Sequence, residues 1–126
     1  MINDTKSFIE EIEASKSNLA GANLMRASLE GANLVGANLK NAKLMGAFLM
    51  GANLMGANLM GANLSDANLR AAHLGDANLI GVNLRGANLR GARLMGTDMR
   101  NVMNLSRSQI DSAIVDKKTR LPEIIE

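Results

Sequence analysis

Aromatic side chains are nearly absent from this sequence, which contains no Trp, no Tyr and only two Phe, Phe8 and Phe48. A globular core normally uses large aromatic rings to fill irregular space. The apolar residues are instead mainly Leu, Ala and Met. We therefore expect a regular core that is filled by a few types of small or medium-sized side chain, each repeated many times.

The chain also has no Cys, one His and one Pro among its 126 residues. Without cysteine it can form neither disulfides nor thiolate metal sites. The net charge of +2, from 14 basic and 12 acidic residues, is too small to indicate nucleic acid as a partner. The N-terminal stretch MINDTKSFIEEIE has no basic segment followed by an apolar one, so it is unlike a secretory signal and we expect a cytoplasmic protein.

A stretch without charged residues between Lys43 and Asp66 is 22 residues long, which is enough for a helix to cross a bilayer. Three Asn and four Gly interrupt it. The same phrase continues on both sides, with charged residues in the slot that Met occupies here. We therefore predict no membrane span.

A five-residue repeat runs from Ser17 to Met99 and is clearest in ANLMGANLMGANL, residues 52–64. We name its slots by the central apolar residue, i. Slot i is Leu sixteen times, from Leu19 to Leu94, and then Met99. Slot i−2 is Ala in fourteen of seventeen repeats, slot i−1 is Asn in eleven and slot i+2 is Gly in eleven, whereas slot i+1 varies freely.

A period of five fits neither an α-helix nor a strand. On a helix, successive Leu would lie about 140° apart around the axis, and on a strand an odd step would place them on opposite faces. A chain that turns a corner every five residues keeps slots i−2 and i inside and slot i−1 outside. Gly at slot i+2 suits the position of a type II turn that needs positive φ. We predict a different turn at Arg26 and Ala71, which occupy that slot unfavourably.

Tandem A(N/D)LxG resembles the pentapeptide repeat family, and the resemblance covers Ser17 to Val115. It implies an all-β solenoid: a right-handed quadrilateral β-helix with four pentapeptides per coil and about five coils. The corner argument alone does not distinguish four sides from three. The resemblance also implies a non-enzymatic interaction surface, because the best understood members resemble duplex DNA in shape and negative charge and bind type II topoisomerases.

With four repeats per coil, Leu residues twenty positions apart stack in columns. Two of these columns form the predicted core ladder: Leu24, Leu44, Leu64 and Leu84, and then Leu34, Leu54, Leu74 and Leu94.

We divide the chain into an N-terminal helical cap over residues 1–16, a β-helix over 17–115 and a C-terminal tail over 116–126. Residues 3–16 predict a short helix in which Phe8, Ile9 and Ile12 share one face and cover the open end of the β-helix.

The repeat slips in phase after Met99, where the next triplets are in frame with each other but one residue late. We expect a single-residue insertion near 101–104, followed by sides at 108–110 and 113–115 that complete a fifth coil. The tail then leaves the repeat. Its Leu121, Ile124 and Ile125 either fold over the last coil or dock on a second copy of the chain.

No arrangement of residues predicts catalysis, a metal site or a cofactor. His73 stands alone in an outward slot. Asp66 and Asp76 occupy corner slots two corners apart, where they are expected to form turns. The Gly residues recur because the corners do, and none lies in a phosphate-binding loop. We predict that the protein is not an enzyme and that it binds no cofactor.

Two surface features suggest a partner. Met fills slot i+1 repeatedly from Met45 to Met60, beside Phe48, and flexible thioethers can form an adaptable contact surface. Arg is concentrated in the later coils. For the Met residues the alternative is that slot i+1 tolerates any residue and that Met folds back over the corner. For the Arg residues the alternative is a solvated face without function. The candidate partner surface consists of Phe48, Met50, Arg70, Arg85, Arg90 and Arg93.

These observations predict a non-enzymatic scaffold that binds another protein, with a homodimer through the C-terminal end as one arrangement. A DNA mimic that binds a topoisomerase is disfavoured by the basic later coils and the short length. Weak binding of anions or nucleic acid through the Arg-rich side is the other alternative, although nucleic acid is not the expected partner.

Overall fold

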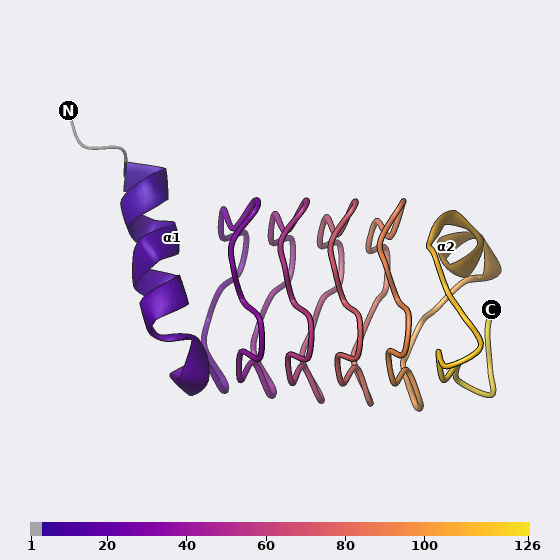
Figure 1. Ribbon diagram of the computed structural model, residues 1–126. Helices are drawn as coiled ribbons and strands as arrows, with labels where there is room; N and C mark the ends of the chain where they lie inside the picture. The colour runs from indigo at the N-terminus through magenta and orange to yellow at the C-terminus, as the bar shows by residue number, and fades with distance from the viewer. Residues whose placement is uncertain (1–3) are drawn as a thin grey trace.

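The computed structural model describes residues 4–126, so the first three residues of the predicted cap lie outside the described part. The chain forms a rod of stacked coils (Figure 1). Helix α1 (Asp4–Ala14) and the 3₁₀ turn η1 (Lys16–Asn18) precede the coils, and helix α2 (Arg107–Ser112) follows them. In Figure 1, α1 lies across the N-terminal end of the rod and α2 lies at the opposite end.

Neighbouring coils are joined by isolated parallel bridges between residues 20 apart, from Asn23 with Lys43 to Asn83 with Met103. Since the sequence repeats every five residues, one such coil contains four repeats and has four sides. The Lys43 carbonyl accepts the Leu24 N–H at 2.8 Å, and the Lys43 N–H donates to the Ala22 carbonyl at 2.9 Å. We number the sides 1 to 4 by their slot i residues in the first coil: Leu19, Leu24, Leu29 and Leu34.

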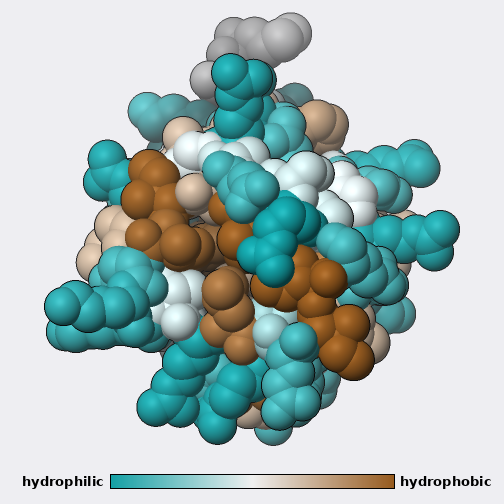
Figure 2. Space-filling view, turned by 90° about the vertical axis from the view of Figure 1, so that its right-hand side faces the viewer, coloured by the Kyte–Doolittle hydropathy of each residue, from teal (hydrophilic) through white to brown (hydrophobic). Residues whose placement is uncertain are grey.

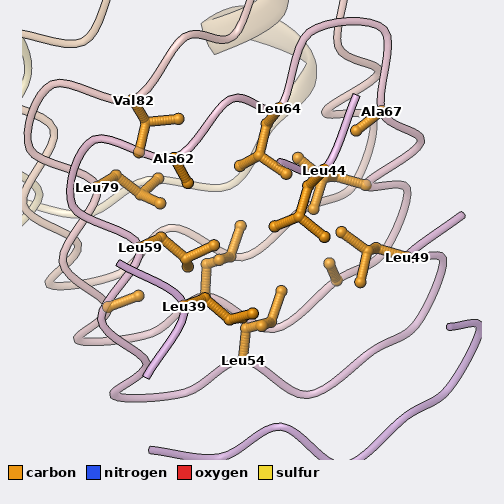
Figure 3. Packing of buried hydrophobic residues seen from close by; sticks show 14 of the residues in the cluster. Leu39, Leu44, Leu49, Leu54, Leu59, Ala62, Leu64, Ala67, Leu79 and Val82 are labelled. Carbon is orange, nitrogen blue, oxygen red and sulfur yellow. The ribbon is translucent and has the colours of Figure 1, made fainter. Parts of the chain in front are cut away.

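Slots i−2 and i fill the inside of the rod. All sixteen Leu from Leu19 to Leu94, both ladder columns included, are at most 5% exposed. Figure 3 shows Leu and Ala side chains of successive coils pointing toward one another in the interior. Each buried Leu contributes about 2 kcal/mol relative to an exposed one. Where Thr97 replaces Ala, its buried hydroxyl donates to the Leu74 carbonyl at 2.6 Å.

The residues at slot i+2 adopt positive φ whether or not they are Gly. Gly56 has a φ of 66°, and Arg26 and Ala71 have 56° and 58°. The prediction of a different turn at Arg26 and Ala71 is therefore wrong. The N–H groups of these two residues donate to carbonyls of the next coil at 2.9 and 3.0 Å, and a different turn would leave those groups unpaired.

The Asn side chains of slot i−1 fix the corners from outside. In ten repeats the Asn Oδ1 accepts the backbone N–H of slot i+1 at 3.0–3.3 Å, as Asn58 does from Met60. This is an Asx-turn, which satisfies a donor that has no partner in the neighbouring coil. The preference for Asn is thus explained by the corner that follows it.

Helix α2 replaces a side of the last coil, so the prediction of a repeat side at 108–110 is wrong. The Ser106 hydroxyl accepts the Gln109 N–H at 3.1 Å, and the Gln109 side chain accepts the Ser106 N–H at 2.8 Å. These two bonds form a capping box, which starts a helix.

The register shifts by one residue between Met103 and Ile114, because the bridge of Ile114 with Arg93 spans one residue more than a full coil. Asn104 is the extra residue: it is exposed with a φ of 62°, while Leu105 is buried in the core. The extra residue thus lies at the end of the segment 101–104.

The tail does not leave the coil after residue 115 as predicted. Arg120 forms a parallel bridge with Asp98, at a register one residue longer again, and its N–H donates to the Thr97 carbonyl at 2.9 Å. Pro122 is buried and Ile125 packs against the core. The segment from 116 to 126 therefore completes the last coil.

Replacing Ala71 with Gly is expected to stabilise the protein by about 1 kcal/mol, because a left-handed conformation costs an alanine about 1–2 kcal/mol. The matched control is Gly56→Ala, where an added Cβ meets nothing within 4 Å, so that only the φ of 66° is unfavourable. We expect it to lower the free energy of unfolding by a similar amount. Urea unfolding measures both, and equal stability of all three proteins would contradict the corner geometry.

Candidate interaction surfaces

The few residues that could act as catalytic groups or metal ligands lie at corners or in bridges of the coils. Among residues 4–126, no group of three or more His, Cys, Asp or Glu is placed to hold a metal ion. Asp66 and Asp76 adopt positive φ at corners, and their carboxylates occupy the space where a Cβ on Gly86 or Gly96 would lie. His73 is bridged between two neighbouring coils on side 4.

Over residues 4–126, neither the length nor the hydropathy of any helix suffices for it to traverse a bilayer.

Helix α1 packs against the core of the rod. Ile12 of α1 is 9% exposed and belongs to the core, and Phe8 and Ile9 pack against it. The Glu13 carboxylate accepts the Asn33 N–H of the first coil at 2.7 Å. A side chain thus supplies the acceptor that a preceding coil would otherwise provide.

The C-terminal end is apolar and exposed. Of nine exposed large hydrophobic residues, five lie between positions 103 and 124. Figure 2 looks onto this end of the rod and shows hydrophobic residues gathered near its centre with hydrophilic ones around them. We define the C-terminal apolar face as Ile114, Val115, Leu121 and Ile124, which are 48%, 40%, 38% and 79% exposed.

The backbone of this end is also an open edge. In the preceding coil, the Leu94 N–H donates to the Ile114 carbonyl and the Met99 N–H to the Arg120 carbonyl, both at 2.7 Å. The corresponding N–H groups of Val115 and Leu121 have no acceptor among residues 4–126. Unpaired edges of this kind are templates for pairing with another chain.

Asp116 holds the last corner in place. Its Oδ1 accepts the N–H groups of Gly96, Lys118 and Thr119 at 3.0–3.1 Å, and the Thr119 hydroxyl donates to it and to the Leu94 carbonyl. Desolvation raises the pKa of Asp116, but the hydrogen bonds from Gly96, Lys118 and Thr119 outweigh it and lower the pKa below its usual value. The Asp116 carboxylate therefore accepts the Gly96 N–H at the corner of the last coil, where the register is longer than twenty residues.

The structure brings four residues of the candidate partner surface to side 3. Phe48, which is 41% exposed, is bridged to Asn68 of the next coil. The corner that follows carries Met50, Arg70 and Arg90 in consecutive coils, because the Gly51 N–H donates to the Arg70 carbonyl at 2.9 Å and the Ala71 N–H to the Arg90 carbonyl at 3.0 Å. These four residues therefore form one strip along the rod.

The other two candidates flank this strip. Arg85 lies at the corner that precedes side 3, and Arg93 lies on side 4, where it is bridged to His73. Both side chains are exposed.

One Arg of the later coils is already neutralised. The Arg100 Nη2 lies 2.7 Å from the Asp98 Oδ2, the one ion pair found among residues 4–126, and the Arg100 Nε donates to the Asp98 Oδ1 at 2.9 Å. The Arg100 guanidinium lowers the pKa of Asp98. The spacing of Asp98 and Arg100, two positions apart in the sequence, is the signal that sets Arg100 apart from the other arginines of the later coils.

The Met residues lie along the corners. The Met55 side chain is 44% exposed, and its terminal methyl lies 3.9 Å from where a Cβ of Gly75 would be. Met45, Met50 and Met60 are half-buried. The four Met side chains in slot i+1 from Met45 to Met60 are therefore partly folded against the rod.

The sequence and the fold were compared with known proteins. The family described as pentapeptide repeats matches residues 14–44, 22–61, 32–69 and 62–101, with eight copies of the repeat. Among solved structures, the chain is 34% identical to alr5209, a pentapeptide repeat protein from Nostoc Pcc 7120, over 95% of this chain and 87% of that one, with a TM-score of 0.69. No curated protein matches the chain significantly.

Two other solved structures are cyanobacterial. Rfr23, a pentapeptide repeat protein from Cyanothece 51142, is 34% identical over 71% of this chain and 64% of that one, with a TM-score of 0.35. HetL from Nostoc sp. strain PCC 7120, which is involved in heterocyst differentiation regulation, is 28% identical over 83% of this chain and 62% of that one, with a TM-score of 0.44. The chain thus spans less than two thirds of each of these two proteins.

Protonation of Asp116 is expected to weaken the last coil. Because the pKa of Asp116 is lowered on folding, its contribution to stability is complete above its ordinary value of about 3.9 and is lost as the pH falls through the folded-state value. The variant Asp116→Asn keeps an acceptor without the charge. We expect a smaller loss of stability between pH 7 and pH 3 in this variant than in the wild type, measured by urea unfolding. Identical losses would contradict the role of the carboxylate.

Proposed function

Since the chain belongs to the pentapeptide repeat family, whose members form right-handed quadrilateral β-helices, we propose that it is a non-enzymatic scaffold that binds other protein surfaces. The rod has about five coils, α1 closes its N-terminal end, and its C-terminal apolar face contacts a second copy of the chain. We place it in the cytoplasm. The different chemistry of the two ends is the observation that carries this proposal.

The two ends differ in both apolar surface and backbone pairing. At the N-terminal end, Ile12 is buried and Glu13 pairs with a backbone donor of the first coil. At the other end, Ile124 is 79% exposed, and the N–H groups of Val115 and Leu121 have no acceptor among residues 4–126. Exposed apolar patches with a polar rim mark association sites, so association is expected at the C-terminal apolar face.

A contact between two such ends is self-complementary. When the same face of two copies meets across a two-fold axis, both faces are consumed and the assembly stops at a dimer. The segment over 116–126 then acts as the last coil and as part of the interface. The segments over 1–16 and 17–115 act as the cap and the body of one structural unit.

Replacing Ile124 with Glu is expected to weaken self-association about tenfold or more, because a charge would be buried in an apolar contact. Fold stability should hardly change, since the side chain is 79% exposed. The matched control is Val35→Glu at a corner of the first coil, where the side chain is 42% exposed. Sedimentation equilibrium measures both variants. A strictly monomeric wild type, or equal weakening by the control, would rule out this interface.

The alternative of a DNA mimic is disfavoured by charge. Residues 70–93 contain four Arg and one Asp, whereas duplex DNA is uniformly negative. A positively charged surface attracts phosphate and carboxylate groups. It would therefore not bind in place of a nucleic acid in the basic groove of a DNA-binding protein.

The protein is therefore expected to leave DNA supercoiling by a type II topoisomerase unchanged. Supercoiling by gyrase is measured with increasing amounts of the protein, with bovine serum albumin as the control. Inhibition that albumin does not cause would favour the DNA-mimic alternative and contradict the charge argument.

A further inference from the structure

We infer that side 3 of the rod, from Phe48 to Arg90, binds an extended acidic segment of a partner protein. Arg70 and Arg90 contact carboxylates of that segment, and Phe48 with Met50 contacts an apolar residue next to them. This inference rests on the proposed scaffold function and names the surface and the chemistry of its partner.

The strip starts from a fixed backbone. Phe48 is bridged to Asn68, and Asn68 to Asn88, so their side chains project from neighbouring coils about 4.8 Å apart. The Arg70 N–H donates to the Asn68 Oδ1 at 3.2 Å, and the Arg90 N–H to the Asn88 Oδ1 at 3.1 Å. Because the backbone of the strip is already fixed, binding does not have to order it, which limits the entropic cost on this side of the contact.

The two guanidinium groups of the strip are available. Arg70 and Arg90 are exposed, and neither takes part in an ion pair within residues 4–126. Arg100, in contrast, is held by the Asp98 carboxylate at 2.7 Å. Two like charges one coil apart repel each other, and an anion between them relieves this repulsion.

In the two coils that carry Arg70 and Arg90, slot i+2 at the corner of side 3 holds no acidic residue. After Arg70 and Arg90, slot i+2 holds Ala71 and Gly91, whereas Asp66 and Asp76 occupy this slot at the corners of sides 2 and 4. The flanking Arg85 lies near Asp66, whose carboxylate sits over the neighbouring Gly86. Arg70 and Arg90 therefore have no acidic residue in slot i+2 of their own corners.

The length of the strip favours a peptide over a nucleic acid. Glu30 occupies the same corner in the first coil, and the column ends at α2, which carries Asp111, because the Gly91 N–H donates to the Ser112 carbonyl at 2.9 Å. A duplex extending along the rod would pass over these acids. Phe48 is the one exposed aromatic residue in the described part, so stacked bases find no continuous platform.

An extended peptide fits this spacing. Alternate side chains of a strand lie about 6.7 Å apart on one face. Two carboxylates at positions i and i+2 of the partner can therefore reach Arg70 and Arg90, which are flexible side chains on neighbouring coils. An apolar residue farther along the same peptide then lies over Met50 and Phe48.

The inference is tested by titrating the isotopically labelled full chain with a synthetic peptide that has Glu at alternate positions and Leu at one end. We expect saturable shifts of the backbone amide signals of Asn68, Arg70 and Arg90, which weaken as salt is added. The double variant Arg70→Gln with Arg90→Gln should raise the dissociation constant about tenfold or more. The matched control Arg100→Gln removes an Arg that Asp98 already neutralises, and it should change binding little.

Several results would overturn the inference. These are the absence of shifts at those amides, equal weakening by Arg100→Gln, equal binding of a peptide with Gln in place of Glu, and tighter binding of a DNA duplex at the same amides. The Ile124→Glu variant separates this inference from self-association, because it should bind the peptide as the wild type does. If the dimer is lost and peptide binding is retained, the inference about side 3 stands. If peptide binding is absent and the dimer forms, the proposed C-terminal interface stands.

Discussion

Backbone hydrogen bonds between neighbouring coils are the constraint on which the other features of this structure depend. Each coil presents N–H groups and carbonyls to the residues about twenty positions away. Pairing all of them requires a corner every five residues with positive φ at slot i+2. Arg26 and Ala71 accept that conformation although it is locally unfavourable, because a broken ladder would leave buried polar groups unpaired. The narrow interior that results admits little beyond Leu at slot i and Ala at slot i−2.

The hydrogen-bond ladder between coils has one edge at each end of the rod, and the two edges differ in how their backbone groups are paired. At the first edge, α1 covers the core and the Glu13 carboxylate replaces a missing carbonyl. At the last edge, Asp116 plays a similar part for the Gly96 N–H, but beyond it the N–H groups of Val115 and Leu121 find no acceptor in the described part of the chain. Because the interior is nearly uniform, the residues that distinguish one repeat from another lie mainly at this edge and in the outward slots.

The repeat itself made most of the fold predictable. Its period placed the Leu columns inside, and the resemblance to a family supplied the number of sides, which the corner argument did not. With four sides per coil, Phe48, Met50, Arg70 and Arg90 fall in one strip. Periodicity did not predict the places where side chains form hydrogen bonds with backbone groups. The Asn Oδ1 bonds at the corners, the capping box of Ser106 with Gln109 and the acceptor role of Asp116 do not alter the hydrophobic period. The sequence SRSQ has the spacing of a capping box and could have predicted the start of α2. No sequence pattern indicated the longer register of the corner at Asp116.

Amide hydrogen exchange in the monomer tests the central claim most directly. If the ladder between coils governs the corners, the Arg26 and Ala71 amides should be as strongly protected as the Gly56 amide, since all three donate to a carbonyl of the next coil at 2.9–3.0 Å. The Val115 and Leu121 amides should exchange rapidly at the open edge. Rapid exchange at Ala71, or strong protection at Val115 and Leu121 in a monomer, would contradict the account.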